Sequence, residues 1–172
     1  MTRPGKLFNF IFAAVVAADQ VAKFWAVHWL APRGSVSLLG NVARLTFVRN
    51  RGAAFGLLPG NLWLLVVASV VALLVVAYAL VVLPPGRRRE RVALALVAGG
   101  AVGNLVDRLR MGQVVDFLDV GIGETYRWPT FNVADSAVSV GIILLLLWSG
   151  MRRNAAEPAA ESPELKISGG SS

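Results

Sequence analysis

Three apolar runs, each long enough to cross a lipid bilayer, account for much of this 172-residue sequence. They cover residues 7–30, 61–83 and 131–151. A helix rises 1.5 Å per residue, so roughly 20 apolar residues cross the hydrocarbon core. A fourth run, 92–109, is shorter and carries polar residues at its far end. We therefore predict an all-α integral membrane protein with four transmembrane helices.

Composition supports a membrane location and excludes several kinds of chemistry. The chain is 56% hydrophobic and 16% charged, whereas a soluble domain is about a quarter charged. It contains no cysteine, which excludes disulfides, zinc–thiolate sites, thiol nucleophiles and lipidation on cysteine. The first run is longer than the apolar core of a signal peptide and contains Asp19 and Lys23, so we expect it to be retained.

The positive charge of the chain predicts how it lies in the membrane. Four arginines occupy the short connection 87–91, and further basic residues precede the first helix and follow the fourth. In a four-helix topology these places share one side, which the positive-inside rule makes cytoplasmic. The opposite connections also carry arginines, so the density of the 87–91 connection decides the orientation. We expect both termini to be cytoplasmic, and the net charge of +7 does not indicate nucleic acid.

The rest of the sequence divides into two outer connections and a tail. Residues 31–60 predict a small extracytoplasmic β-rich insertion between the first two helices, with a hairpin turn at Gly40–Asn41. Residues 110–130 form a second outer loop, with short strands expected around 114–120. Residues 154–172 are small, polar and rich in Pro, Gly and Ser, which predicts a disordered cytoplasmic tail. Residues 1–153 then form a single membrane-embedded domain.

Polar residues inside the predicted helices are candidates for function, because they are costly in a membrane. Asp19 and Lys23 are spaced i and i+4 on the first helix, either as a self-neutralising pair or as a brace for other helices. On the third helix Asn104, Asp107 and Arg108 form a polar stripe, which either faces the bundle interior or caps the helix at the interface. Gly99 and Gly103 on this helix permit close helix packing.

The fourth helix begins with a stripe that contains Asn132 and Asp135. Asp135 alone is readily explained as a helix-capping carboxylate. However, the preceding loop contributes Asp116 and Asp119, so several carboxylates converge at one membrane boundary. This convergence indicates either a paired-aspartate catalytic site or a cation site.

The other catalytic possibilities are few. His28 is the only histidine and sits between Trp25 and Trp29, where an interfacial anchor is the ordinary interpretation. The sequence has no metalloprotease motif, no serine–histidine pair and no phosphate-binding loop. An aspartate pair is left for hydrolysis, with one carboxylate ionised and the other protonated. The alternatives from other classes are a proton-coupled transporter, which would spread its acidic residues through the membrane, and a non-catalytic scaffold.

Five stretches of the sequence resemble the bacterial lipoprotein signal peptidases, also called signal peptidase II. They occur in the order found in that family and cover nearly the whole predicted membrane region. They are "DQVAKFW" (19–25), "VRNRGAAFG" (48–56), "GGAVGNLVDRL" (99–109), "VVDF" (114–117) and "FNVADSAVSVG" (131–141).

The resemblance implies an aspartic endopeptidase of the bacterial cytoplasmic membrane. It would remove signal peptides from prolipoproteins on the amino side of a diacylglyceryl-modified cysteine, with its active site near the extracytoplasmic face. Carried over by motif, the catalytic pair is Asp116 and Asp135, and no metal or cofactor is expected. Membrane lipid and globomycin-type cyclic peptides become expected partner and inhibitor. Residues expected to position substrate or brace the site are Asp19, Lys23, Asn50, Gly56, Asn104, Asp107, Arg108, Asn132 and Ala134.

Overall fold

The computed structural model describes residues 4–52 and 61–156, and four long helices dominate it. They are α1 (Pro4–Trp25), α2 (Leu62–Val82), α3 (Arg88–Met111) and α4 (Val133–Ala156). The predicted residue Gly56 and residues 157–172 of the predicted tail lie outside the described residues. α4 ends at Ala156, three residues into the segment that we predicted as tail.

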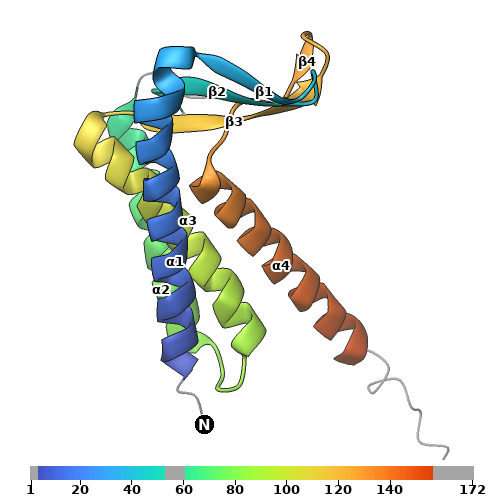
Figure 1. Cartoon of the computed structure of the whole chain (residues 1–172). Helices are drawn as coiled ribbons and strands as arrows, with labels where there is room; N and C mark the ends of the chain where they lie inside the picture. The colour runs from blue at the N-terminus through green and yellow to red at the C-terminus, as the bar shows by residue number, and fades with distance from the viewer. Residues whose placement is uncertain (1–3, 53–60, 157–172) are drawn as a thin grey trace, which may run out of the picture.

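α3 is the central helix, because it packs against each of the other three. It begins at Arg88, four residues before the predicted start. The apolar run marks only the membrane-like part of the helix. The preceding arginines are good helix formers, and Glu90 in the first turn is favoured by the helix dipole. The start of α1 and the end of α4 lie at one end of the molecule, away from the sheet (Figure 1).

Three of the described helices are long and apolar enough to cross a membrane: α1 with its continuation to Arg33, α2 and α3. The apolar part of α4, Val133–Trp148, is shorter. Large apolar side chains such as Leu74, Val81 and Leu146 are exposed on these helices. A soluble protein would bury most such residues, so these surfaces fit contact with lipid.

A four-stranded antiparallel sheet lies across one end of the helices (Figure 1). Its strands are β1 (Ser35–Leu39), β2 (Ala43–Asn50), β3 (Val114–Ile122) and β4 (Tyr126–Arg127), in that spatial order. The first hairpin turns at Gly40, whose φ of 48° suits glycine. The predicted β-rich insertion is therefore present, but the sheet also takes two strands from the connection between α3 and α4.

The sheet is fixed to the end of α1 by a small apolar core. α1 continues as a π-helical turn, η1 (Ala26–Leu30), whose Ala26 and Leu30 are fully buried. They pack against Val115 and Phe117 of β3. Residues 115 and 117 share one face of the strand, because side chains alternate along it. Asp116 consequently points to the opposite face.

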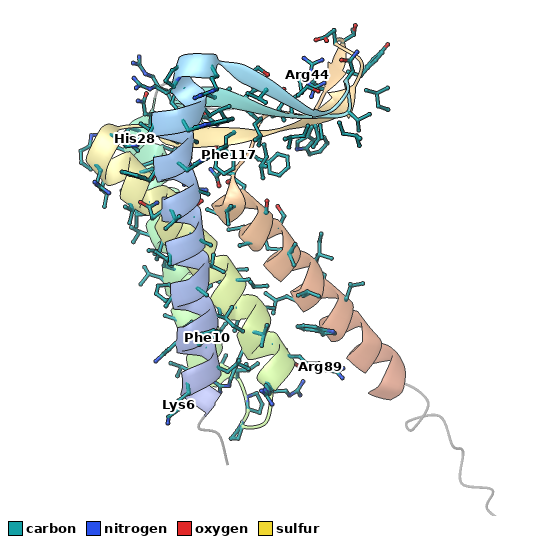
Figure 2. All side chains as sticks on the ribbon, viewed as in Figure 1. Lys6, Phe10, His28, Arg44, Arg89 and Phe117 are labelled. Carbon is teal, nitrogen blue, oxygen red and sulfur yellow. The ribbon has the colours of Figure 1, made fainter. Side chains whose placement is uncertain are left out.

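Polar side chains mark both ends of the molecule (Figure 2). Lys6 and Arg89 lie at the end away from the sheet, whereas His28 and Arg44 lie at the sheet end. At the tip of the sheet Arg44 forms an ion pair with Glu124. This pair joins the β1–β2 hairpin to the β3–β4 hairpin.

Candidate active site

Asp116 lies near the start of β3, with only 1% of its surface exposed. Asn50 at the end of β2 donates a hydrogen bond to its Oδ2 over 2.8 Å. Asn132 donates to its Oδ1 over 2.7 Å. The pairing of β2 with β3 sets the first contact, because Asn50 lies opposite Val114 in the register. Two amide groups thus hold both oxygens of a buried carboxylate.

Asp135 lies in the first turn of α4 and forms a reciprocal cap with Asn132. The Asn132 side chain accepts a hydrogen bond from the backbone N–H of Asp135 over 2.9 Å. The Asp135 carboxylate in turn accepts from the backbone N–H of Asn132 over 3.2 Å. This is the geometry of a capping box, which satisfies N–H groups left free at a helix start. The capping interpretation of Asp135 therefore holds alongside any chemical role.

Two asparagines connect the carboxylates of Asp116 and Asp135. Asn132, which is fully buried, donates to Asp116 and also to Asn104 Oδ1 over 3.1 Å. Asn104 on α3 donates from Nδ2 to Asp135 over 2.7 Å. An amide side chain donates and accepts at once, so it suits a link between acidic groups. The two aspartates, 19 positions apart in the sequence, belong to one hydrogen-bond network.

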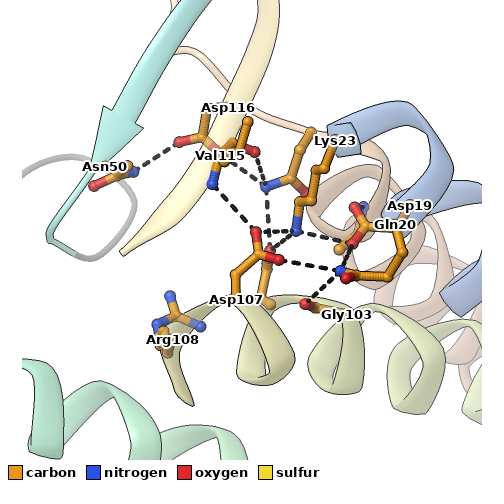
Figure 3. Close-up of polar contacts among 12 residues, drawn as sticks. Asp19, Gln20, Lys23, Asn50, Gly103, Asp107, Arg108, Val115 and Asp116 are labelled. Atoms are coloured by element: carbon orange, nitrogen blue, oxygen red, sulfur yellow. Dashed lines mark hydrogen bonds and ion pairs between the residues drawn. The ribbon is translucent and has the colours of Figure 1, made fainter. Parts of the chain in front are cut away.

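A buried ion cluster lies beneath this network (Figure 3). Lys23 contacts Asp19 over 2.8 Å and Asp107 over 2.9 Å, and all three side chains are at most 3% exposed. Lys23 also donates to Asn104 Oδ1 over 2.9 Å. The side-chain amide of Asn104 thus connects Lys23 to Asp135 through two hydrogen bonds. Asp19 and Lys23 are more than a self-neutralising pair, because they join α1 to α3.

The same ion cluster positions the backbone that carries the aspartate pair. Asp19 accepts a hydrogen bond from the backbone N–H of Ala134 at the start of α4. Asp107 accepts one from the N–H of Val115, next to Asp116. A Cβ on Gly103 would lie 2.6 Å from Asp19 Oδ2, so glycine is required where α3 meets α1. Asp107 therefore faces the interior and is not an interface cap.

Gln20 also belongs to the ion cluster, although it was not among the residues predicted to brace the site. Its Nε2 lies 3.2 Å from Asp19 Oδ2 and 3.1 Å from Asp107 Oδ1. It also contacts the carbonyl oxygen of Gly103 (Figure 3). Its position three residues before Lys23 places both on one helix face. This spacing in the sequence predicts that Gln20 faces the same interior as Lys23.

A pocket of about 630 Å³ opens beside the aspartate pair. Asp116 and Asp135 line it together with apolar and small side chains of α2, α3 and α4. Arg108 also lines the pocket and donates weakly to Ser69 Oγ over 3.4 Å. The guanidinium lies on the side of Asp107 away from Lys23 (Figure 3). α2 forms one wall of the pocket through Leu65, Ala68, Ser69 and Ala72.

Asp119 does not join the other aspartates. Arg127 donates to its Oδ1 over 2.6 Å, and Thr46 donates to its Oδ2 over 2.9 Å. Asp119 lies three residues after Asp116, and an odd separation puts two strand side chains on opposite faces. The expected convergence of carboxylates therefore includes Asp107, Asp116 and Asp135 but not Asp119. His28 is exposed and contacts Phe24.

The environment of Asp116 favours its protonated form. Its pKa is raised to about 6, chiefly by burial and also by the nearby charge of Asp135, while the hydrogen bonds from Asn50 and Asn132 oppose this shift. Carboxylates outnumber cations in the group of buried and pocket-lining side chains to which Asp116 belongs. The four carboxylates are Asp19, Asp107, Asp116 and Asp135, and the two cations are Lys23 and Arg108. Asp116 therefore keeps a proton to a higher pH than an ordinary aspartate does.

The alternative of a cation site finds little support in the arrangement of these groups. Among the residues that the structure describes, no three acidic or histidine side chains are grouped so that they could hold a metal ion. Asp19 and Asp107 already bind Lys23. The arrangement suits proton transfer between two carboxylates that are held by neutral amides.

Apolar helices around a buried polar network, with two linked carboxylates beside a pocket, are the features of a membrane protein with a polar site inside its helix bundle. The sequence model of signal peptidase (SPase) II matches residues 11–151. The chain belongs to the signal peptidase II family, and it is a membrane peptidase. The resemblance inferred from its motifs is thereby confirmed.

Relatives with similar sequences and structures agree with this placement. The lipoprotein signal peptidase of Geobacillus kaustophilus is 42% identical, and the match covers 81% of this chain and 90% of the relative. That of Syntrophomonas wolfei is 44% identical, with coverage of 79% and 87%. A solved bacterial membrane enzyme superposes with a TM-score of 0.76 at 28% identity, covering 91% of this chain and 92% of its own. A second solved bacterial membrane enzyme superposes with a TM-score of 0.72 at 32% identity, covering 81% of this chain and 90% of its own.

Proposed function

We propose that the protein removes signal peptides from prolipoproteins by cutting on the amino side of a diacylglyceryl-modified cysteine, with Asp116 and Asp135 as the catalytic pair. The observation that carries this proposal is the link between the two carboxylates through Asn132 and Asn104, on the wall of a largely apolar pocket. Neutral amide donors orient both carboxylates without supplying a proton to either.

The proposed chemistry uses one proton shared by the two aspartates. The ionised carboxylate takes a proton from a water molecule, and the oxygen of that water attacks the scissile carbonyl carbon. The protonated carboxyl donates a hydrogen bond to the carbonyl oxygen as negative charge develops there. Collapse of the tetrahedral intermediate breaks the C–N bond, and a carboxyl proton passes to the leaving amine. The two carboxyls end with one proton between them again.

The walls of the pocket fit a lipid-modified substrate. Leu65, Ala72 and Val138 line it with apolar surface from α2 and α4. These two helices pack on α3 rather than on each other. The peptide near the cut would lie at the aspartates, and the acyl chains would follow the apolar walls. Asn50 and Arg108 would position this substrate, while the Lys23 cluster, Asn104 and Ala134 would brace the carboxylates.

We also propose the topology of the protein. Four transmembrane helices would place the sheet and the aspartate pair at the extracytoplasmic face of a bacterial cytoplasmic membrane. Both termini and the 87–91 connection would be cytoplasmic, and residues 1–153 would form one membrane domain. Lys6 and Arg89 at the end opposite the sheet support this orientation (Figure 2). Inhibition by globomycin-type cyclic peptides is expected from family resemblance.

The test is cleavage of a purified prolipoprotein with and without its lipid. Protein in detergent or lipid should shorten the diacylglyceryl-modified substrate, and mass spectrometry should find the lipidated cysteine as the new N-terminus. The unmodified precursor should remain uncut. Cutting at another bond, or equal cutting of both substrates, would contradict the proposed specificity.

A further inference from the structure

Arg108 lines the pocket and has a hydrogen-bond donor without a partner among the described residues. Its Nε is buried and has no hydrogen-bond partner among the described residues. Its one hydrogen bond there is the 3.4 Å contact from an Nη to Ser69 Oγ. A guanidinium carries five N–H donors and accepts nothing. A buried donor without a partner is costly, so the site is suited to an oxygen acceptor that arrives with a ligand.

Ser69 determines where the guanidinium points. Its hydroxyl donates to the carbonyl oxygen of Leu65 over 2.9 Å, one turn earlier on α2. This bond uses the single hydroxyl proton and leaves an oxygen lone pair for Arg108. Ser69 thus draws Arg108 toward α2, across the pocket from α4. The interaction is weak at its length, so Ser69 acts as a positioning residue and Arg108 as the binding group.

The position of this contact along α2 points to the kind of acceptor. Ser69 lies seven residues after the start of α2 at Leu62, which is about 10 Å along a helix. Apolar and small residues of the pocket surround this level, including Leu65, Ala68 and Ala72. A peptide cut at Asp116 would pass above it. A diacylglyceryl group joined to cysteine by a thioether has no phosphate, and its strong acceptors are two ester carbonyl oxygens.

We infer that Arg108, positioned by Ser69, forms a subsite that binds an ester carbonyl oxygen of the substrate's diacylglyceryl group. This inference rests on the proposed function and extends it from the cut bond to the recognition of the lipid. It explains why a polar pair sits on an otherwise apolar wall. It also gives the enzyme a means to distinguish an acyl-glycerol from a plain alkyl chain, which offers no acceptor.

The test compares two substrates that differ only at the ester carbonyls. One prolipoprotein carries the diacylglyceryl group, and the other carries the matching dialkyl ether. With the parent enzyme, KM should be about ten- to a hundredfold higher for the ether, the range expected for a hydrogen bond from a charged donor. The value of kcat should change much less, because the hydrogen bond to the ester carbonyl is made equally in the bound substrate and in the transition state.

Variants of Ser69 then separate positioning from general damage. Ser69→Ala should raise KM for the ester about three- to tenfold and leave KM for the ether unchanged. Ser69→Thr keeps a hydroxyl that bonds the preceding turn and should restore the parent values. Ser37→Ala removes a hydroxyl that bonds Gly40 on the exposed β1–β2 hairpin and should alter neither substrate.

The outcomes of these experiments test the ester subsite and the proposed function separately. Equal KM values for the ester and the ether in the parent enzyme would overturn the subsite, while cleavage itself would still support the proposed function. Equal losses on both substrates in Ser69→Ala would also overturn it, because Ser69 would then act only on the fold. Cleavage of neither substrate by the parent enzyme would contradict the proposed function itself.

Discussion

Replacing Asn132 with serine should separate the capping of α4 from the positioning of Asp116. Asn132 uses its Oδ1 to accept from the backbone N–H of Asp135 and its Nδ2 to donate to Asp116. Serine is about as good a helix cap as asparagine. However, its shorter side chain carries one hydroxyl and cannot do both tasks. Alanine can do neither.

The expected magnitudes follow from these two hydrogen bonds. Loss of a cap to alanine costs about 1 kcal/mol of stability, whereas exchange for serine costs a few tenths. Loss of a hydrogen bond to a charged acceptor costs about 1.5–3 kcal/mol. If that bond holds Asp116 in its reactive position, both variants should cleave about 10- to 100-fold more slowly. Both variants should unfold at a lower temperature, and Asn132→Ala should lose about 1 kcal/mol more than Asn132→Ser because it also loses the cap.

The assay pairs cleavage kinetics with thermal unfolding of the same preparations. Asn61 provides a matched control, because its side chain caps α2 by accepting from Leu64 N over 3.2 Å and makes no contact with the aspartates. Asn61→Ala should lose stability and keep its turnover rate. Near-parent turnover by Asn132→Ser would refute the positioning role of Asn132. A loss of stability in Asn132→Ser as large as that in Asn132→Ala would refute the capping analysis.

Three further predictions concern topology, packing and pH. A membrane-impermeant thiol reagent should label Ser35→Cys and Tyr126→Cys from outside intact cells but not Arg89→Cys; labelling of the last would invert the proposed orientation. Gly103→Ala should lose about 1–3 kcal/mol of stability by overpacking, because its Cβ would lie 2.6 Å from Asp19 Oδ2. In the control Gly5→Ala the new Cβ meets nothing within 4 Å, so thermal unfolding should not change. The pKa of Asp116 is raised from 3.8 to about 6, so protonation of Asp116 stabilises the folded state. The free energy of unfolding should therefore fall by about 3 kcal/mol as the pH rises from 4 through 6. Asp116→Asn should therefore gain thermal stability relative to the parent between pH 4 and pH 8, and a difference independent of pH would count against the raised pKa.

The apolar helices and their inward polar stripes were predictable from the sequence. Runs of about 20 apolar residues have few alternatives in a membrane. A charged residue such as Asp19 or Lys23 must face the interior, because lipid offers it no partner. The β1–β2 hairpin was also predictable, since Gly40 sits between two alternating segments. In each case the decisive interactions are local or are imposed by the membrane.

Contacts between distant segments were less accessible to sequence reasoning. The pairing of β2 with β3 joins residues 43–50 to 114–120, and strand alternation alone does not reveal a partner. Ser69 is an unremarkable serine in an apolar helix until α3 brings Arg108 beside it. The choice of Asp116 over Asp119 came from family resemblance. The odd spacing between them, once β3 is taken as a strand, gives the same separation on physical grounds.

The proposed catalytic pair is tested by the cleavage rates of four variants under one set of conditions. Asp116→Asn and Asp135→Asn keep the shape of the side chain but cannot transfer a proton. Each should lose at least about 10²- to 10⁴-fold in kcat. The double variant should be little slower than either single one, because the losses caused by replacing residues that act as a unit are not additive. Asp119→Asn, which disturbs only the contacts with Arg127 and Thr46, should keep most of its activity. Substantial cleavage by Asp116→Asn or Asp135→Asn would contradict the account.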